Sequence, residues 1–224
     1  MDAAAAYAPW YAEVSGVRIA YLGFSQVWEL WETWRAGEDR PGIAYAMDAA
    51  RALAAVRAAA DLVVVYLHWG EEGNACPTVR MRDLATELAG AGADLMVGTH
   101  AHLLLGGGWL GRTYVQYGLG NFLWWRDDWF SNDTGVLWVT LRGAGIDSVE
   151  FRPAVISRQT ASRSRQRGRT GPDRRSVRGA AGMHRAGRGP VTRGTPGWRC
   201  GADSAKVLNR HRGRPEPCGR SAVW

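Results

Sequence analysis

The sequence lacks several features that would identify the class of the protein: paired cysteine motifs, long apolar runs and a secretory signal. It holds 224 residues and three cysteines, none in the Cys-x-x-Cys spacing of many zinc and redox sites. We expect these cysteines to be free or incidental thiols. No run reaches the roughly 18 apolar residues of a transmembrane helix. The first residues also lack the positive segment and apolar core of a secretory signal, so none is predicted.

Lysine is nearly absent, and the arginines gather at one end of the chain. Residues 1–157 contain 11 Arg and no Lys against 18 acidic residues, a net charge of −7. Residues 158–224 contain 16 Arg and one Lys against three acidic residues, a net charge of +14. The overall charge of +7 therefore describes the second part, whereas the first part is acidic.

The basic part also lacks the residues of a core. From residue 158 onward there is no Ile, Phe or Tyr. Such a segment cannot bury enough apolar surface to offset its chain entropy, so we predict a disordered low-complexity tail over residues 158–224. Three origins stay open: a frameshifted reading of GC-rich DNA, a passive extension, or an arginine-rich tether for nucleic acid or an anionic polymer. Nucleic acid is the partner we expect least.

What the chain does have is a strand, helix, strand unit. Residues 61–67 are a continuous apolar run, typical of a parallel strand that is covered on both faces. Residues 78–91 have apolar side chains at helical spacing, and residues 94–97 form a second apolar strand. Residues 113–117 are a third strand by residue type. The pattern predicts an α/β fold.

Shorter patterns flank this unit. Residues 10–25 indicate a hairpin or two short strands, and residues 48–60 indicate a helix with Asp48 capping its start. Residues 135–155 predict a late antiparallel hairpin. Residues 103–109 include three consecutive glycines, which we predict to be too flexible for a regular element.

Residues 27–34 combine an amphipathic helical pattern with Trp28, Trp31 and Trp34. Two interpretations stay open. The indoles either pack a small helix onto the sheet or form an aromatic wall that faces a substrate.

Three histidines follow the two predicted strands of the central unit: His68, His100 and His102. Parallel strands end at the same edge of a sheet, so these side chains should converge there. Residues two apart on an extended backbone point the same way, which would aim His100 and His102 at one point. Imidazoles suit Zn, Mn or Fe, so the pattern predicts a metal site. The alternative for each histidine alone is a hydrogen-bonded core or loop residue.

Three segments carry a family resemblance: HWGEE at residues 68–72, GTHAH at residues 98–102 and YGLGNF at residues 117–122. In this order they resemble the CapA family of bacterial poly-γ-glutamate capsule synthesis proteins, which is similar in fold to calcineurin-like metallophosphoesterases. The resemblance covers about residues 14–153. It implies that residues 1–157 are the C-terminal portion of a CapA-like domain, a partial metallophosphoesterase sheet with helices that ends in antiparallel strands.

The resemblance also implies a chemistry. It suggests a metal-dependent hydrolase of a phosphoester or an anionic envelope polymer, with divalent Mn, Zn or Fe held by His68, His100 and His102. Glu72 and Asn121 match family positions. We expect His68, Glu72 and Asn121 to take part in catalysis, the last two in acid–base transfer, ligand orientation or substrate binding. Family members are often associated with the cell surface, so envelope biosynthesis proteins are expected partners.

The chain departs from the family at its start. Family members carry acidic and Asn-Asn-His segments before the region matched here, whereas this chain has no His before His68 and no Asn before Asn74. We therefore expect a chain truncated at its N-terminus, with an incomplete metal site and impaired hydrolysis. The alternatives are a non-catalytic envelope-assembly or polymer-binding protein, and an inactive fragment.

Overall fold

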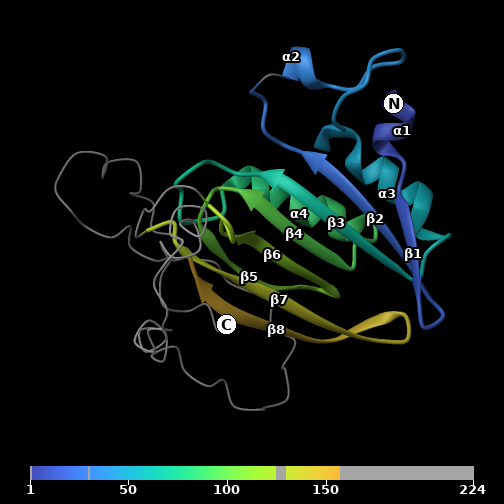
Figure 1. Cartoon of the computed structure of the whole chain (residues 1–224). Helices are drawn as coiled ribbons and strands as arrows, with labels where there is room; N and C mark the ends of the chain where they lie inside the picture. Colours follow the sequence, from blue (N-terminus) through green and yellow to red (C-terminus); the bar gives the residue numbers. More distant parts are fainter. Residues whose placement is uncertain (1, 30, 125–129, 157–224) are drawn as a thin grey trace, which may run out of the picture.

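The computed structural model describes residues 2–29, 31–124 and 130–156, so the expected basic tail lies outside the described residues. Its centre is a six-stranded sheet in the order β1-β2-β3-β4-β6-β5 (Figure 1). The predicted α/β class is confirmed. The strands are β1 (Trp10–Val14), β2 (Val17–Ser25), β3 (Leu62–Trp69), β4 (Leu95–His100), β5 (Leu104–Leu110) and β6 (Thr113–Leu119).

The directions of the strands determine at which edge of the sheet a ligand site can form. Strands β2, β3, β4 and β6 run parallel, whereas the edge strands β1 and β5 pair antiparallel to their neighbours. The crossover from β3 to β4 runs through helix α4 (Val79–Gly90), as the sequence pattern predicts. The carboxyl ends of the parallel strands therefore meet at one edge, where ligands of α/β sheets gather.

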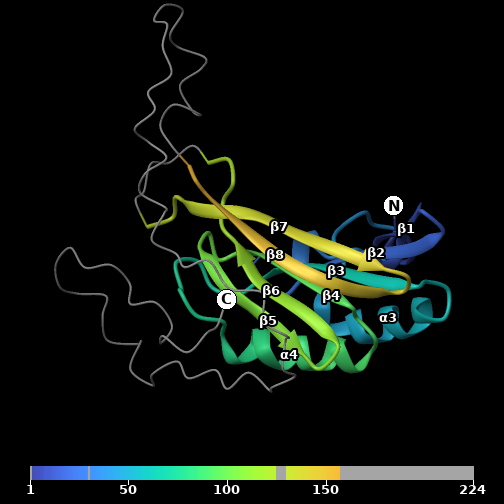
Figure 2. The same ribbon diagram turned by 90° about the horizontal axis from the view of Figure 1, so that it is seen from below.

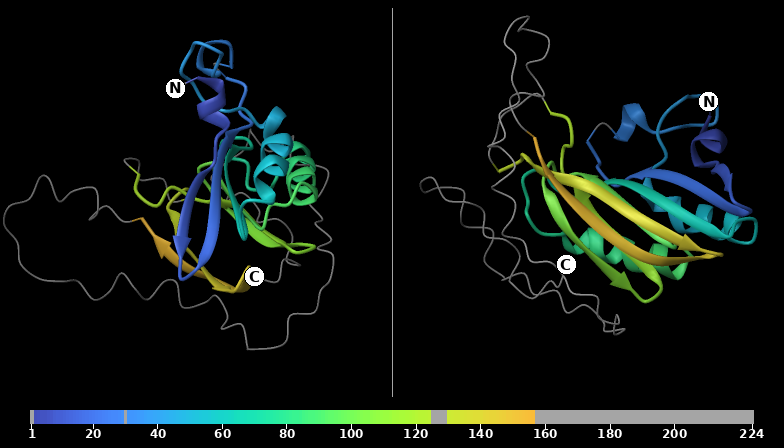
Figure 3. Two further views of the ribbon diagram at one scale, coloured as in Figure 1. Left: turned by 90° about the vertical axis from the view of Figure 1, so that its right-hand side faces the viewer. Right: turned by 60° about the horizontal axis from the view of Figure 1, so that its bottom comes forward.

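The molecule has three layers. Helices α3 (Ala49–Arg57) and α4 cover one face of the sheet, and a separate hairpin of β7 and β8 lies on its other side (Figures 2 and 3). The predicted late antiparallel strands are thus confirmed. No helix in the described part of the chain is long and apolar enough to span a membrane. The remaining elements are α1 (Ala3–Tyr7), α2 (Trp31–Trp34), the 3-10 turn η1 (Ala46–Asp48), β7 (Asp133–Arg142) and β8 (Gly145–Val155).

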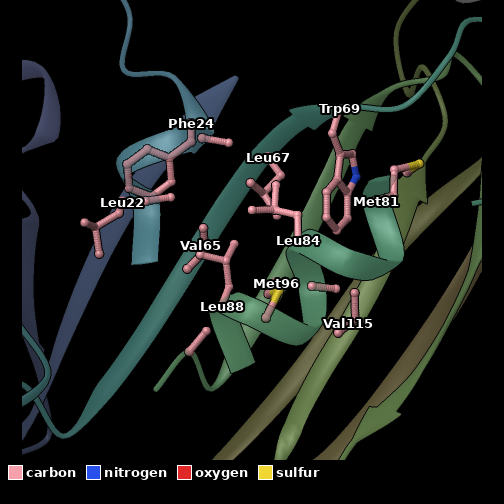
Figure 4. Close-up of a cluster of buried hydrophobic side chains, with 14 of the residues drawn as sticks. Leu22, Phe24, Val65, Leu67, Trp69, Met81, Leu84, Leu88, Met96 and Val115 are labelled. Carbon is pink, nitrogen blue, oxygen red and sulfur yellow. The ribbon is translucent and has the colours of Figure 1, made fainter. Parts of the chain in front are cut away.

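The core lies between the sheet and α4 (Figure 4). Alternate residues of β3 face the helices because successive side chains of a strand point to opposite faces. The helix presents one apolar stripe to them. Burying each large side chain contributes roughly 1.5–3 kcal/mol, which fixes β3 and β4 against α4. Core residues labelled in the close-up include Leu22, Phe24, Val65, Leu67, Trp69, Met81, Leu84, Leu88, Met96 and Val115.

The helix starts differ from one another. Thr78 caps α4, because its hydroxyl accepts a hydrogen bond from the Met81 N–H at 3.2 Å. Asp48 precedes α3, yet its side chain makes no capping bond to the helix backbone. Its carboxylate pairs instead with Arg51 at 3.2 Å, so the predicted capping role of Asp48 is wrong.

Two further expectations are wrong. The helix expected over residues 27–34 is only the four-residue α2 in the described residues, and Trp34 is exposed. The glycine segment expected to be irregular is strand β5. Its glycines allow close approach, because a Cβ on Gly107 would lie 2.4 Å from Oε1 of Gln116. The Gln116 amide in turn donates to the Leu105 carbonyl at 2.6 Å, which holds β5 in place.

Candidate functional site

The three motif segments interlock at the carboxyl edge of the sheet. The Trp69 indole N–H donates to the Tyr117 carbonyl at 3.0 Å, and the two rings stack with centroids 5.4 Å apart. Gly98 lies against both: a Cβ there would be 2.1 Å from the Trp69 nitrogen and 2.2 Å from the Tyr117 oxygen. Each segment thus supplies one part of a single contact, which fixes the backbone next to the three histidines.

The structure brings the three predicted histidines together. The ring centroids of His68 and His100 are 4.5 Å apart, and those of His100 and His102 are 6.3 Å apart. The expected reason is wrong, because His100 and His102 do not lie on extended backbone. Their φ angles are +92° and +56°. Such positive values are uncommon for residues other than glycine and cost free energy, and they gather at functional sites.

The environment favours neutral imidazoles. Burial lowers the pKa of His68 below its ordinary value, and the neighbouring charges of His100 and His102 lower it further. Burial also lowers the pKa of His100, while the charges of Glu72 and Glu29 oppose that shift. Since only a neutral imidazole has a free lone pair, both side chains are in the form that binds metals near pH 7.

Asn121 fixes the orientation of His102. Its Oδ1 lies 2.6 Å from Nδ1 of His102, while its Nδ2 donates to the carbonyls of His102 and Ser131, each at 3.2 Å. An amide oxygen only accepts, so Nδ1 of His102 carries the proton. In the neutral form of this imidazole, Nε2 holds the lone pair that could bind a ligand.

Glu72 lies at the open side of this cluster. Its Oε1 is 3.7 Å from Nε2 of His102, and its side chain is 67 % exposed. The loop that carries it is tied to the histidine loop by the Gly73 N–H, which donates to the Ala101 carbonyl at 2.9 Å. Glu72 is therefore near enough to orient His102 or a ligand, but beyond hydrogen-bond distance of the imidazole.

Sequence reasoning missed two neighbours of the cluster. The Trp124 ring lies against His102, with centroids 4.6 Å apart. The charge of Glu29 acts on His100 although the two residues are far apart in the sequence. Neither belongs to a periodic pattern, so the position of Glu29 could have been found only by recognising that β2 ends beside β3.

The donor chemistry suits a transition metal, whereas the arrangement is not that of an assembled metal centre. Among residues 2–29, 31–124 and 130–156, no three His, Cys, Asp or Glu side chains form a group that could hold an ion as placed. The neutral imidazoles of His68 and His100 and the free Nε2 of His102 fit a divalent ion by donor type. Side-chain rotation would be needed to bring them onto one ion.

Cys76 lies in the loop between the first histidine and α4 and carries a disulfide. The expectation of a free thiol is therefore wrong for this residue. The other two cysteines, Cys200 and Cys218, lie outside the described residues.

Comparison with known proteins gives the family. The family model described as "Bacterial capsule synthesis protein PGA_cap" matches residues 1–124, more than half of the chain. The chain belongs to this family. The predicted CapA resemblance is thus confirmed, and the matched region contains all three motif histidines together with Glu72 and Asn121.

Two relatives and one solved structure illustrate the similarity. The PGA biosynthesis protein CapA of Bacillus subtilis (strain 168) is 33% identical over 152 residues, 67% of this chain and 40% of the relative. The capsule biosynthesis protein CapA of Bacillus anthracis is 33% identical over 153 residues, 65% of this chain and 36% of the relative. The chain thus spans about two fifths of the length of these relatives.

The sulfate thiohydrolase SoxB of Thermus thermophilus has a TM-score of 0.44 to this chain, with 19% identity over 66% of this chain and 24% of that one. Such a partial likeness carries no argument about activity.

Proposed function

We propose that this protein acts in the synthesis of a bacterial capsule polymer, poly-γ-glutamate or a related anionic envelope polymer, and that the histidine cluster is its metal-dependent hydrolytic site. Family membership supports the first part. The observation that carries the second is the convergence of His68, His100 and His102 at one sheet edge. Within this proposal, residues 1–157 are one structural unit.

The residues of the cluster have separate tasks in this proposal. His68 and His100 offer neutral imidazoles, and His102 offers Nε2 because Asn121 holds its other nitrogen. When bound, a divalent Mn, Zn or Fe ion would polarise the bond to be broken and acidify a water molecule. Glu72 is the exposed carboxylate that can take up or release a proton beside His102.

The available donor atoms determine how many metal ions we expect and how strongly they are bound. Three imidazoles and one exposed carboxylate suit a single ion, whereas two-metal hydrolases hold a pair of ions about 3.5–4 Å apart. We therefore expect one ion, held weakly, and slow turnover. A non-catalytic role in polymer binding would require no ion at all, so metal content separates the two functions.

Metal retention tests the proposal directly. The full-length protein is stripped with a mild chelator, reloaded with Mn, Zn or Fe, and dialysed against buffer that contains the same metal at a fixed low concentration. The metal in the protein sample is then measured in excess of that in the buffer. We expect about one ion per chain in the unchanged protein. His100→Ala with His102→Ala should lose it, because two of the three imidazoles are gone.

The matched control is His184→Ala with His211→Ala, which removes the same number of imidazoles outside the described residues. This variant should retain the ion. Equal metal content in all three proteins would overturn the proposal, since the ion would then be bound elsewhere. Absence of metal from the unchanged protein would overturn it as well.

A further inference from the structure

The sheet edge that carries the histidine cluster also carries a cluster of aromatic rings, Trp28, Trp31 and Tyr45, here called the aromatic wall. The Trp28 and Trp31 centroids are 4.9 Å apart, and Trp31 meets Tyr45 edge-on at 4.9 Å. Tyr45 is 1 % exposed, whereas Trp28 is 43 % exposed. Within the aromatic wall, Tyr45 is thus the buried ring and Trp28 the ring that is open to solvent.

The aromatic wall belongs to the same sheet edge as the histidines. It begins just after β2, whose last residue, Ser25, pairs with His68 in the strand register. The next residue, Gln26, donates its N–H to the His68 carbonyl at 2.8 Å. Ser25 also bridges to Tyr45. The chain then rises from the tip of β2 to α2 (Figure 1), so the wall borders the site through backbone contacts.

Two guanidinium groups lie over the tryptophans. The Cζ of Arg80 is 5.8 Å from the Trp28 centroid, and the Cζ of Arg35 is 4.5 Å from the Trp31 centroid. Gln26 links the first of these to the wall, because its side-chain amide donates to the Arg80 carbonyl at 3.0 Å. Within the described parts of the chain, neither arginine forms an ion pair with a carboxylate.

A cavity continues the surface beyond Trp31. It has a volume of about 360 Å³ and is lined by Trp31 and Arg35, with Tyr7, Met47, Asp48 and Arg51 among its other walls. Asp48 pairs with Arg51 at 3.2 Å, so Arg35 is the guanidinium of this lining that forms no ion pair within the described residues. Aromatic faces, an aliphatic thioether and the guanidinium of Arg35 are thus present together. Such a mixture suits a ligand that alternates methylene groups with negative charges.

We propose that the aromatic wall and its two guanidinium groups bind a flexible chain that carries carboxylates. Its methylene groups would lie on the indole faces, while its carboxylates would pair with Arg80 at the start of α4 and with Arg35 at the cavity. The arginines are suited to this because a guanidinium binds a carboxylate through two parallel hydrogen bonds. This inference rests on the proposed function, because it names the residues that would hold the anionic polymer of that proposal.

The competing explanation is that the arginines and tryptophans form cation–π pairs that have only a structural role and bind no ligand. Cation–π pairs at exposed positions are worth roughly 0.5–1 kcal/mol and form without any ligand. The two explanations differ in one measurable way: only a binding surface should bind a carboxylate chain less tightly once Arg35 and Arg80 are replaced. The arginines of residues 158–224 attract carboxylates in every variant alike, so the comparison among variants decides between the two.

The test is calorimetric titration of the full-length, metal-free protein with an oligomer of about six glutamates and with the glutamine oligomer of equal length. We expect the glutamate oligomer to bind and the glutamine oligomer to bind at least about tenfold more weakly. Arg35→Gln with Arg80→Gln should weaken glutamate binding by a similar factor, and Trp28→Ala should weaken binding too. Thermal melting of each variant confirms that it is folded.

Arg112→Gln is the control. Arg112 is exposed in the turn between β5 and β6, where residues 110 and 113 pair, away from the carboxyl ends of β3 and β4. Its loss removes one positive charge and should leave binding unchanged. Equal binding of both oligomers would overturn the inference. It would also be overturned if Arg112→Gln weakened binding as much per charge removed as the Arg35 and Arg80 pair, since only net charge would then matter.

The two proposals can fail separately. His100→Ala with His102→Ala should lose the metal and still bind the glutamate oligomer, because the aromatic wall does not include those side chains. If the protein retains the metal but Arg35→Gln with Arg80→Gln binds the glutamate oligomer as tightly as the unchanged protein, the aromatic wall is refuted and the proposed function stands. If that variant loses binding but the unchanged protein retains no metal, the proposed function is refuted and the aromatic wall stands.

Discussion

Two tyrosines show how unevenly polar groups contribute at the scale of single residues. The Tyr7 hydroxyl donates to the Tyr45 carbonyl at 2.9 Å and accepts from the Tyr45 N–H at 3.0 Å. It thereby holds α1 to the strand-like segment that follows α2. The hydroxyl of Tyr45 is itself buried and has no hydrogen-bond partner within the described residues. One hydroxyl therefore pairs two backbone groups, whereas the other pairs none.

The two phenylalanine variants should accordingly differ. Tyr7→Phe leaves the Tyr45 backbone groups without their partner and should reduce the free energy of unfolding by about 1–3 kcal/mol. Tyr45→Phe removes a buried hydroxyl that makes no bond in the described structure, so we expect no loss or a small gain. Chemical denaturation of both proteins gives the comparison. A larger loss for Tyr45→Phe would show that its hydroxyl has a partner.

At the scale of elements, one arginine joins α3 to two strands. Arg57 at the end of α3 donates to the Asp94 carboxylate at 2.5 Å and to the Gly92, Ala60 and Asp61 carbonyls at 2.6–3.1 Å. Asp94 in turn accepts the Val63 N–H of β3 at 2.8 Å. The start of β3 and the turn before β4 are thus fixed to the same helix end.

Arg57→Met should lower the free energy of unfolding by about 2–4 kcal/mol, because it leaves Asp94 and several carbonyls without their donor. Arg51→Met is the matched control on the same helix. Arg51 is 84 % exposed and, within the described residues, forms an ion pair with Asp48 alone, so its loss should cost less than about 1 kcal/mol. Urea denaturation measures both, and similar losses would contradict the prediction.

Helices and strands could be predicted where their burial produces a regular pattern of apolar residues in the sequence. The apolar runs of β3 and β4 and the spacing of α4 are of this kind, and all three are found. Strand β5 does not follow from its sequence, because consecutive glycines indicate flexibility, whereas Gly107 is needed here to admit the Gln116 side chain. The helical spacing over residues 27–34 predicts too long a helix, because tryptophans at this spacing also fit a cluster of rings.

The sequence predicts at which edge of the sheet the candidate site lies, but not the detailed geometry of its side chains. The order of strands places His68, His100 and His102 together, and this follows from parallel pairing alone. The positive φ angles of His100 and His102 depend on tertiary contacts that the His-x-His spacing does not contain. The same holds for the bond between His102 and Asn121, which joins residues 19 positions apart.

At the scale of the whole molecule, the hairpin of β7 and β8 is less securely attached than the rest. Its two strands pair only with each other, and Trp138 is 52 % exposed. Thr134 provides one link to the main sheet: its hydroxyl donates to the Leu119 carbonyl at 2.7 Å and accepts from the Phe122 N–H at 3.1 Å. Few buried contacts therefore resist local opening of this hairpin.

Hydrogen exchange should show this difference. We expect backbone amides of β7 and β8 to exchange at least about tenfold faster than those of β3 and β4, since local opening follows buried contact density. Thr134→Val should increase exchange in the hairpin and leave β3 unchanged. Mass spectrometry of exchanged peptides gives both comparisons. Equal protection of the hairpin and of β3 would mean that the molecule opens as one unit.

The contact among Trp69, Gly98 and Tyr117 bears on how this protein can change over time. A larger side chain at Gly98 would displace the indole and the carbonyl together, and a smaller one at Trp69 would leave the glycine facing a void. Mutations at these positions should therefore be tolerated only in combination. We therefore expect an engineer who wishes to transplant the histidines to have to move all three segments at once.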